Sequence, residues 1–191
     1  GFIMHFQIIQ PAGFLKDYIK YYCFMESDIH ETNVIERVIP TENVQLMFHY
    51  KNPFLTCYPD DTTILQPRSI ISGLSNSYAD VSTHGEAGVI FVTFYPTGAC
   101  NFLNFPLLEI ENQSIDLSDI FSREIKQVEE MLYLKKTIKE RVTVVEDFLL
   151  KRYSPIPFYD NLIIKNGVDF IKYYRGQITA GSLSKNLSIT T

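Results

Sequence analysis

One segment near the middle of the chain is apolar on both sides of an extended backbone. Residues 88–95 read Gly-Val-Ile-Phe-Val-Thr-Phe-Tyr. Successive side chains of a β-strand point to opposite faces of its sheet, and here both sets are mainly apolar or aromatic. Such a segment fits a strand that is covered on both faces, so we expect it at the centre of a sheet.

Other segments of the first 116 residues alternate between two kinds of position, which is typical of half-buried strands. The clearest is 43–50, in which one set of alternate side chains is apolar and the other is mixed. The apolar set is Val44, Leu46, Phe48 and Tyr50, and the mixed set is Gln45, Met47 and His49. Residues 18–25 form a second candidate strand. Polar turns separate these segments, so the body is predicted to be an antiparallel β-sandwich or barrel.

The pattern becomes helical between residues 117 and 153. Two apolar stripes have the spacing of an α-helix, and they are Phe121, Ile125, Val128 and Leu132, followed by Ile138, Val142, Val145 and Leu149. Thr137 and Glu140 have the spacing of a capping box, which marks the start of the second helix. Each narrow stripe must pack against the other helix, the β-body or a second subunit. Packing within the subunit is the interpretation we favour.

The composition excludes several classes of protein. A hydrophobic share of 46% is enough for a packed core, so disorder is excluded. The three cysteines are widely spaced and form no CxxC pair, which suits buried thiols in a reducing compartment better than a disulfide framework. No apolar run is long enough to span a bilayer, and the first residues do not resemble a signal peptide. We therefore expect a cytoplasmic protein with no membrane partner.

The charge is unevenly distributed along the chain. Residues 151–191 carry six basic and two acidic side chains, a net charge of +4, which leaves −9 on the first 150 residues. An acidic body with a basic tail is expected when only the tail meets nucleic-acid phosphates. Chance variation over a segment of forty residues is the alternative.

The last sixteen residues have the pattern of the first half of a helix-turn-helix. Thr179 is a good N-cap, and Ile178 and Leu183 have the spacing of a hydrophobic staple around it. Leu183 and Leu187 then share one face of a short helix. Thr190 has the chemistry to cap a second helix that would begin where the sequence stops. An ordinary pair of surface helices at the end of a domain is the alternative interpretation.

A longer helix is predicted just upstream, over residues 158–174, with a basic residue and Gly176 at its end. The order of helix, turn and short helix resembles the start of the DNA-binding domain of AraC/XylS-type transcriptional regulators. The likeness lies in Gly176, Ile178, Leu183 and the turn 187–190. Ser184 and Ser188 depart from the family pattern, which usually has Ala and Gly at these positions. Both replacements are small enough to keep the crossing of the two helices.

The likeness extends to the N-terminal part of the chain. Residues 39–49, 94–99, 105–110 and 114–117 resemble segments of the sensor domains of one AraC-like group, in the same order. The resemblance implies an α+β fold: a cupin-like antiparallel β-barrel or sandwich, a helical hairpin and a partial helix-turn-helix. It predicts a sensor domain over 1–116, a hairpin or linker over 117–153 and an incomplete DNA-binding domain over 154–191.

No motif in the sequence indicates catalysis. A metal-binding cupin would use a His-x-His pair, and none of the four histidines has a partner two residues away. His49 belongs to the mixed set of its strand, so we expect it in solvent or at a rim. The G-x-S-x-G elbow and the glycine-rich phosphate loops are also missing. We expect no enzyme activity, no metal and no cofactor.

A ligand pocket is nevertheless consistent with the predicted barrel, because barrel mouths favour sites lined by aromatic side chains with a few polar groups. The candidate ligand-binding residues are Tyr22, Phe24, Phe48 and Tyr50, with Glu42 and Arg68 as polar anchors. The alternative for each aromatic residue is a place in the core. A stand-alone cupin-like module that binds a small molecule is the alternative to a regulator.

The resemblance also implies partners. DNA would be bound by the full-length protein, whose recognition helix would follow Thr191. Within the chain, Thr179 and Ser182 are candidates for backbone contacts, and Lys185 and Asn186 for polar contacts. We therefore expect these 191 residues alone to bind DNA weakly or not at all. A small-molecule or protein effector and a homodimer, with 121–149 as its interface, complete the prediction.

Overall fold

The architecture was taken from a computed structural model, which describes residues 4–27, 35–38, 42–73, 75, 78–83, 85–104, 110 and 112–156. Its larger sheet has six strands in the order β1-β2-β9-β4-β7-β10, and every neighbouring pair is antiparallel. These strands are β1 (Met4–Ile9), β2 (Ile19–Ser27), β4 (Gln45–His49), β7 (Ser69–Ser72), β9 (Gly88–Phe94) and β10 (Ser114–Asp116). β9 lies inside the sheet, between β2 and β4, as its apolar composition predicts.

A smaller antiparallel sheet has four strands in the order β3-β8-β5-β6. Its strands are β3 (Ile35–Val38), β5 (Leu55–Cys57), β6 (Thr63–Leu65) and β8 (Ala79–Ser82). Phe54 and Val81 on its side pack against Met25 and Val89 of the larger sheet. The two sheets therefore form a sandwich that is joined over part of its area.

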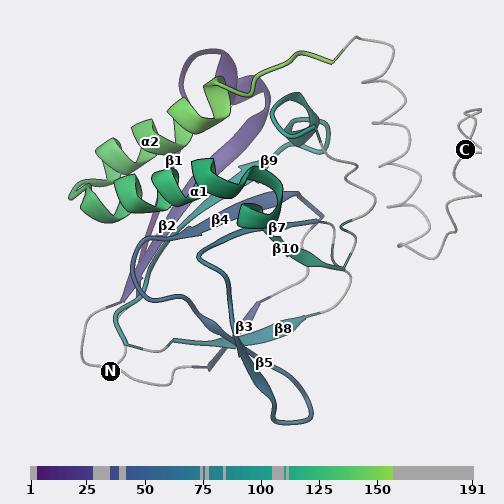
Figure 1. The fold of residues 1–191 in the computed structure, drawn as a ribbon, viewed down its shortest axis with the longest axis vertical. Helices are drawn as coiled ribbons and strands as arrows, with labels where there is room; N and C mark the ends of the chain where they lie inside the picture. Colours follow the sequence, from purple (N-terminus) through teal and green to yellow (C-terminus); the bar gives the residue numbers. More distant parts are fainter. Residues whose placement is uncertain are drawn as a thin grey trace, which may run out of the picture.

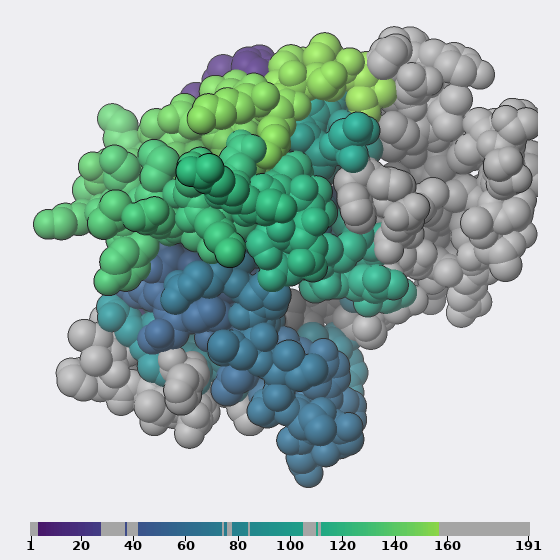
Figure 2. Space-filling model, viewed as in Figure 1, coloured from purple at the N-terminus to yellow at the C-terminus, as the bar shows by residue number. Residues whose placement is uncertain are grey.

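Two helices form a hairpin on the other side of the larger sheet, as Figure 1 shows. They are α1 (Leu117–Leu134), which is kinked at Ser122, and α2 (Ile138–Leu150). Thr137 and Glu140 form the predicted capping box at the start of α2. In Figure 2 the green hairpin lies directly on the blue strands, and the β5–β6 turn projects from the opposite end.

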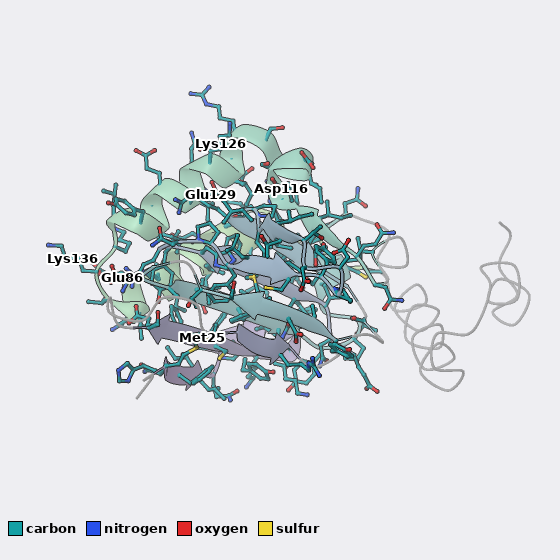
Figure 3. All side chains as sticks on the ribbon, turned by 90° about the horizontal axis from the view of Figure 1, so that it is seen from below. Met25, Glu86, Asp116, Lys126, Glu129 and Lys136 are labelled. Carbon is teal, nitrogen blue, oxygen red and sulfur yellow. The ribbon has the colours of Figure 1, made fainter. Side chains whose placement is uncertain are left out.

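The main core lies between the hairpin and the larger sheet. It contains the inward stripe of α1 with Ile125, Val128 and Leu132, and it also contains the apolar set of β4. The buried side of α2 is wider than its predicted stripe, since Val144 and Phe148 are buried beside Val145 and Leu149. Figure 3 shows Lys126 on the outer side of α1 and Glu129 on the side toward the strands. The prediction that both stripes pack within the subunit is thus confirmed.

Two short 3-10 helices connect strands of the larger sheet. They are η1 (Gly13–Asp17), between β1 and β2, and η2 (Ala99–Asn101), after β9. The whole is the predicted α+β fold, with antiparallel sheets and a helical hairpin. It has two separate sheets, so the barrel alternative of a single closed sheet does not apply. None of the helices in the described ranges is long and apolar enough to cross a bilayer.

The incomplete helix-turn-helix predicted for the C-terminal end lies outside the described residues, as does the helix predicted over 158–174. Two of the four segments of the N-terminal likeness, 39–49 and 105–110, also lie outside them in part. The predicted boundaries at 116 and 153 fall close to the ends of the helical hairpin, which begins at Leu117 and is followed by a turn at Lys151 and Arg152.

Candidate functional site

The face of the larger sheet that is turned toward the smaller sheet is the candidate site, and we call it the inter-sheet face. Side chains of directly paired residues lie on the same side of a sheet, so the strand register divides this face into three rows. The first row is Phe6, Met25, Val89 and His49. The second row is Ile8, Cys23, Phe91, Met47, Ile70 and Asp116. The third row, which we call the polar row, is Tyr21, Thr93, Gln45, Ser72 and Ser114.

The first row is where the two sheets meet. Met25 and Val89 are buried against Phe54 and Val81, and Met47 and Phe91 of the second row pack against the edge of that cluster. Phe6, on the outermost strand of the same row, is 61% exposed. The smaller sheet therefore covers the middle of the first row, and the side chains become more exposed toward β1.

The polar row offers hydroxyl and amide groups in a line across five strands. The Gln45 side-chain amide donates to Thr93 Oγ1 at 3.0 Å, and the hydroxyls of Ser72 and Ser114 lie 2.9 Å apart. Thr93 is buried, whereas Tyr21, Gln45 and Ser72 are half-buried. These groups leave hydrogen-bonding capacity unused, because Gln45 retains an amide oxygen and a second N–H.

The three rows hold one charged side chain, Asp116 at the edge of the second row, and its carboxylate accepts from the Ser118 N–H at 2.8 Å at the start of α1. Cys23 of the second row is half-buried, and this burial raises the pKa of its thiol. The thiol is therefore protonated at neutral pH and behaves as a small apolar group. The arrangement of an apolar floor and one line of neutral hydrogen-bonding groups is typical of small-molecule sites.

His49 lies at the covered end of the first row. It is 1% exposed, with its ring edge-on to Phe54 at 4.8 Å between ring centres, so the expectation of a solvent or rim position was wrong. Its Nε2 lies 3.1 Å from Gln66 Oε1, and the Gln66 amide donates in turn to Thr56 Oγ1. Because the Gln66 oxygen that faces His49 can only accept, the ring proton of His49 is assigned to Nε2. Burial lowers the pKa of His49 to about 4, so the ring is neutral at physiological pH.

The four aromatic residues predicted from the sequence to bind a ligand lie on the opposite face, beneath the hairpin. Tyr22, Phe24, Phe48 and Tyr50 are each at most 1% exposed and belong to the main core. The Tyr22 hydroxyl donates to Glu146 of α2 at 2.9 Å, and the Phe48 ring packs edge-on against Phe148 at 6.2 Å. A small molecule could reach these rings only if the hairpin moved away.

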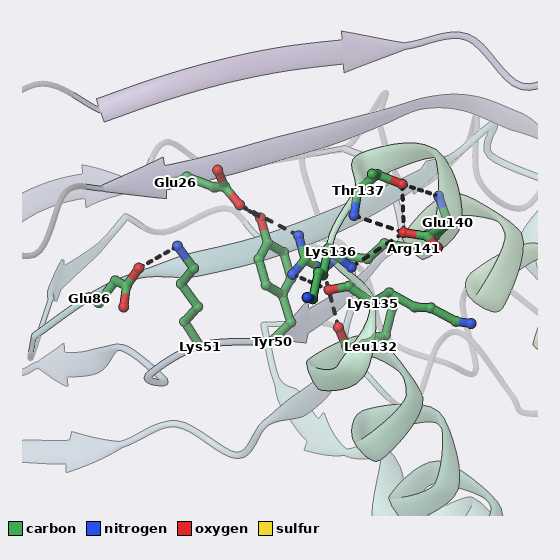
Figure 4. Close-up of polar contacts among 10 residues, drawn as sticks. All are labelled: Glu26, Tyr50, Lys51, Glu86, Leu132, Lys135, Lys136, Thr137, Glu140 and Arg141. Carbon is green, nitrogen blue, oxygen red and sulfur yellow. Dashed lines mark hydrogen bonds and ion pairs between the residues drawn. The ribbon is translucent and has the colours of Figure 1, made fainter.

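Tyr50 takes part in a polar contact that fastens the turn of the hairpin to the sheet, as Figure 4 shows. Its hydroxyl donates to Glu26 Oε1 at 2.6 Å, and the Arg141 guanidinium lies over its ring at 3.8 Å. Arg141 is 8% exposed and donates to the carbonyl oxygens of Leu132 and Lys135 at the end of α1. It thus satisfies carbonyls that the end of a helix leaves unpaired, and it forms a 3.7 Å ion pair with Glu26.

The two polar anchors proposed from the sequence lie apart from the polar row. Glu42 is exposed just before β4, and Arg68 is exposed while its guanidinium donates to the Lys51 carbonyl oxygen at 3.1 Å. The candidate DNA contacts Thr179, Ser182, Lys185 and Asn186 lie outside the described residues. Among the residues that are described, no group of three His, Cys, Asp or Glu side chains could hold a metal ion.

Sequence reasoning missed the polar row and Arg141, although a signal for the row was present. The two apolar stripes of the hairpin must cover one face of a sheet. The more apolar set of alternate side chains in each strand is expected to lie on that face. The mixed phase, with Gln45 and Met47, is then left for the other side. The buried role of Arg141 has no such signal, because an arginine within a helix is ordinarily exposed.

Comparisons with known proteins add a family and two weak structural likenesses. A family model described as a domain of unknown function, DUF6597, matches residues 7–116. The crystal structure of the AraC-like transcriptional activator CuxR is 14% identical, with a TM-score of 0.44, over 100% of this chain and 72% of that one. Protein NMB1881 from Neisseria meningitidis is 9% identical, with a TM-score of 0.33, over 48% of this chain and 84% of that one.

No curated protein matches the sequence. The matched residues of the family model run from the second half of β1 to the last residue before α1, and they include the other nine strands of the two sheets in full. This match covers more than half of the chain. The chain therefore belongs to the family described as domain of unknown function DUF6597.

Proposed function

We propose that this chain is the effector-sensing part of an AraC/XylS-type transcriptional regulator, and that a small molecule binds on its inter-sheet face. The observation that carries the proposal is the contrast between the two faces of one sheet. The face beneath the hairpin is closed by fully buried side chains, whereas the inter-sheet face keeps half-buried apolar groups beside a polar row. A binding site needs accessible groups of both kinds.

The chemistry of this face defines the class of effector. Of Asp, Glu, Lys and Arg, the three rows hold only Asp116, at the sheet edge, whose carboxylate caps α1, and His49 is neutral. A charged ligand would lose its hydration without gaining an opposite charge, which is costly. The effector is therefore an uncharged molecule with an apolar body and one hydrogen-bonding edge. The apolar body lies on Phe91 and Met47, and the edge meets Gln45 and Tyr21.

The regulatory part of the proposal is supported by the sequence. The segments that resemble AraC-like sensor domains include the region of β4 and the loop after β9, and the tail resembles the start of the family's DNA-binding domain. The net charge of +4 on residues 151–191 is the sign that DNA phosphates require. No catalytic role is proposed for any residue of the chain.

Dimerisation is the second part of this proposal, and it would use the outer side of the hairpin, since the inner stripes are occupied. Met131, Tyr133 and Leu134 are 44%, 71% and 65% exposed near the end of α1. A sedimentation measurement of the native chain and of Leu134→Ser tests this surface. Dimers that are lost in the variant support it, and a native chain that stays monomeric at high concentration contradicts it.

A screen of uncharged small molecules by thermal shift tests the ligand site directly. Compounds that stabilise the native chain are expected to lose their effect in Gln45→Leu, which removes the amide from the middle of the polar row. Lys20→Ala is the matched control, because Lys20 is exposed and lies outside the three rows. Hits that bind Gln45→Leu as well as they bind the native chain would place the ligand elsewhere.

Reading the native coding sequence beyond Thr191 tests the DNA-binding part. A continuation of about eighty residues with another capped basic helix would supply a recognition helix. Full-length protein should then retain promoter fragments of its own genome in a salt-dependent manner, whereas the 191 residues should not. A stop codon at this point would favour the alternative, a stand-alone binding module that uses the same inter-sheet face.

A further inference from the structure

One buried residue, Asn101, accepts two hydrogen bonds from the segment that leaves the hairpin. Asn101, in η2, is 2% exposed. Its backbone carbonyl accepts from the Ser154 N–H at 2.7 Å, and its side-chain Oδ1 accepts from the Ile156 N–H at 3.0 Å. Its Nδ2 donates to the carbonyls of Thr97 and Gly98 at 3.0 and 3.2 Å. One residue thereby fixes two alternate amides of the departing chain.

Aromatic packing reinforces this attachment. The Tyr153 ring lies 5.0 Å from Phe14 and 5.5 Å from both Tyr18 and Phe102, measured between ring centres. The hydroxyls of Tyr153 and Tyr18 are 2.7 Å apart and share a hydrogen bond. Residues 153–156 are thus joined to η1, the start of β2 and the loop after β9. We call this set of contacts, centred on Asn101 and Tyr153, the exit joint.

The loop that carries Asn101 is itself fitted closely to Tyr18. The Tyr95 N–H donates to the Tyr18 carbonyl at 2.9 Å. A Cβ atom at Gly98 would lie 2.1 Å from the same carbonyl oxygen, so any side chain there would displace the loop. A shift of Tyr18 relative to β9 would therefore move Asn101 as well.

The exit joint continues directly from the polar row. Tyr21 and Thr93 are the paired residues of β2 and β9 in that row, and Ile19 and Phe94 are the next pair toward the joint. The strand pair is irregular between these two positions, where the register of β2 shifts. A bulge concentrates local twist at one place, so a change at the end of the polar row has a short path to the joint.

We propose that the exit joint is the element through which the inter-sheet face controls the chain that follows residue 156. In this proposal a ligand on the polar row changes the spacing of Tyr21 and Thr93, and the joint opens or closes in response. The joint has two discrete states, with the amides of Ser154 and Ile156 either bonded to Asn101 or released to water. The regulatory meaning of the joint rests on the proposed function, whereas its mechanical role does not.

Hydrogen exchange of single amides in the 191-residue chain tests the mechanical role. In Asn101→Ala the Ile156 amide should exchange roughly tenfold faster or more, because it loses a buried acceptor. Exchange at the Ser154 amide should rise as well when the loop loses the bonds from Nδ2. The matched control is Asn104→Ala, an exposed asparagine three residues further along, which should leave both amides unchanged. Unchanged exchange at both amides in a folded Asn101→Ala protein would contradict the proposal that Asn101 holds residues 154–156.

A second variant keeps the test decisive if loss of the buried Asn101 prevents folding. Ser154→Pro removes the N–H that donates to the Asn101 carbonyl and leaves Asn101 in place. Ser154 is exposed, so the body should fold as before. Trypsin should then cut after Lys151 or Arg152 at least about fivefold faster, because cleavage needs the local chain to open. Equal cleavage of the variant and the native chain would contradict the proposal.

Control by the polar row has its own test. Thr93→Val removes the hydroxyl that Gln45 binds and keeps the shape of the side chain. It should change the exchange of the Ile156 amide by roughly threefold or more, whereas Ser72→Ala, at the other end of the row, should not. If Thr93→Val leaves the joint unaffected, the coupling fails. These measurements use neither DNA nor effector, so their failure would not contradict the proposed function, and a lack of DNA binding would not contradict the joint.

Discussion

The two faces of the six-stranded sheet are built from the same strands, but one face is buried in the core and the other remains partly accessible. Beneath the hairpin, Leu46 and Phe48 are completely buried, whereas Gln45 and Met47, their neighbours in β4, are half-buried on the inter-sheet face. The first face has polar contacts that fasten it, such as Tyr22 with Glu146. The second face has polar groups whose hydrogen-bonding capacity is partly unused. One set of alternate side chains of a strand can thus belong to the core while the other set belongs to a candidate site.

This difference also separates stability from function. The hairpin face has many apolar contacts and few accessible groups, so substitutions there should act on folding. The inter-sheet face has incomplete cover, so substitutions there should act first on binding and cost less in stability. Four measurements test whether the two faces differ in this way.

The largest effect is expected from Phe48, compared with its neighbour Met47. Phe48→Ala should lower the free energy of unfolding by about 3–5 kcal/mol, because it leaves a cavity beneath Phe148. Met47→Ala should cost roughly 1–2 kcal/mol, since its side chain is already half-exposed. Urea unfolding of both variants measures the two values. Equal costs would remove the distinction between the faces.

Arg141 tests whether the hairpin is fastened as well as packed. Arg141→Ala should cost about 3 kcal/mol, because it removes the ion pair of Glu26 and leaves the carbonyls of Leu132 and Lys135 without the donors that Arg141 supplies. The exposed Lys139→Ala should change stability by less than about 0.5 kcal/mol. Unfolding in urea again gives both numbers. An Arg141→Ala protein as stable as Lys139→Ala would mean that apolar packing alone holds the hairpin.

The inter-sheet face has its own signature in pH dependence. The pKa of His49 is lowered by burial to about 4, below the value of about 6.5 expected when the chain is unfolded. The unfolded chain therefore binds the proton more readily, and the stability due to neutral His49 is complete above pH 6.5 and is lost as the pH falls toward 4. Between pH 7 and pH 4.5 this loss should be about 2 kcal/mol.

The variant His49→Gln keeps a group that can bind Gln66 and removes the titration. Its unfolding free energy should fall by less than that of the native chain between the same two pH values. Parallel pH profiles for the two proteins would show that His49 titrates normally and that the covered end of the first row is open to water.

The smallest effect is expected at the capping box, which belongs to neither face. Thr137→Ala removes the hydroxyl that accepts from the Glu140 N–H, so it should cost about 1 kcal/mol. Thr143→Ala, in the exposed middle of α2, is the matched control and should change stability by less than about 0.5 kcal/mol. Thermal unfolding compares them, and similar values would mean that packing alone determines where α2 begins.

The secondary structure was largely open to prediction from local pattern. The alternation of 43–50 corresponds to β4, and the apolar run 88–95 to β9, because each signal depends only on which side chains share a face. The capping box at Thr137 was predicted for the same reason, since its partners are three residues apart. The site was predicted less well. Tyr22 and Phe48 were chosen for their chemistry, whereas their burial depends on contacts with α2, a helix that begins only at Ile138.

Spacing along the backbone was enough to predict β2, β4 and β9, the two helices, and the division of the β4 side chains into an apolar and a mixed set. Only the tertiary structure decided which phase the hairpin covers, and hence which residues are core and which remain accessible. It also decided the places of Arg141, His49 and Asn101. Their burial depends on partners distant in the chain, such as Glu26 for Arg141 and Ile156 for Asn101, whose ion pairs and hydrogen bonds offset the cost of removing polar groups from water. Local periodicity carries no information about such partners.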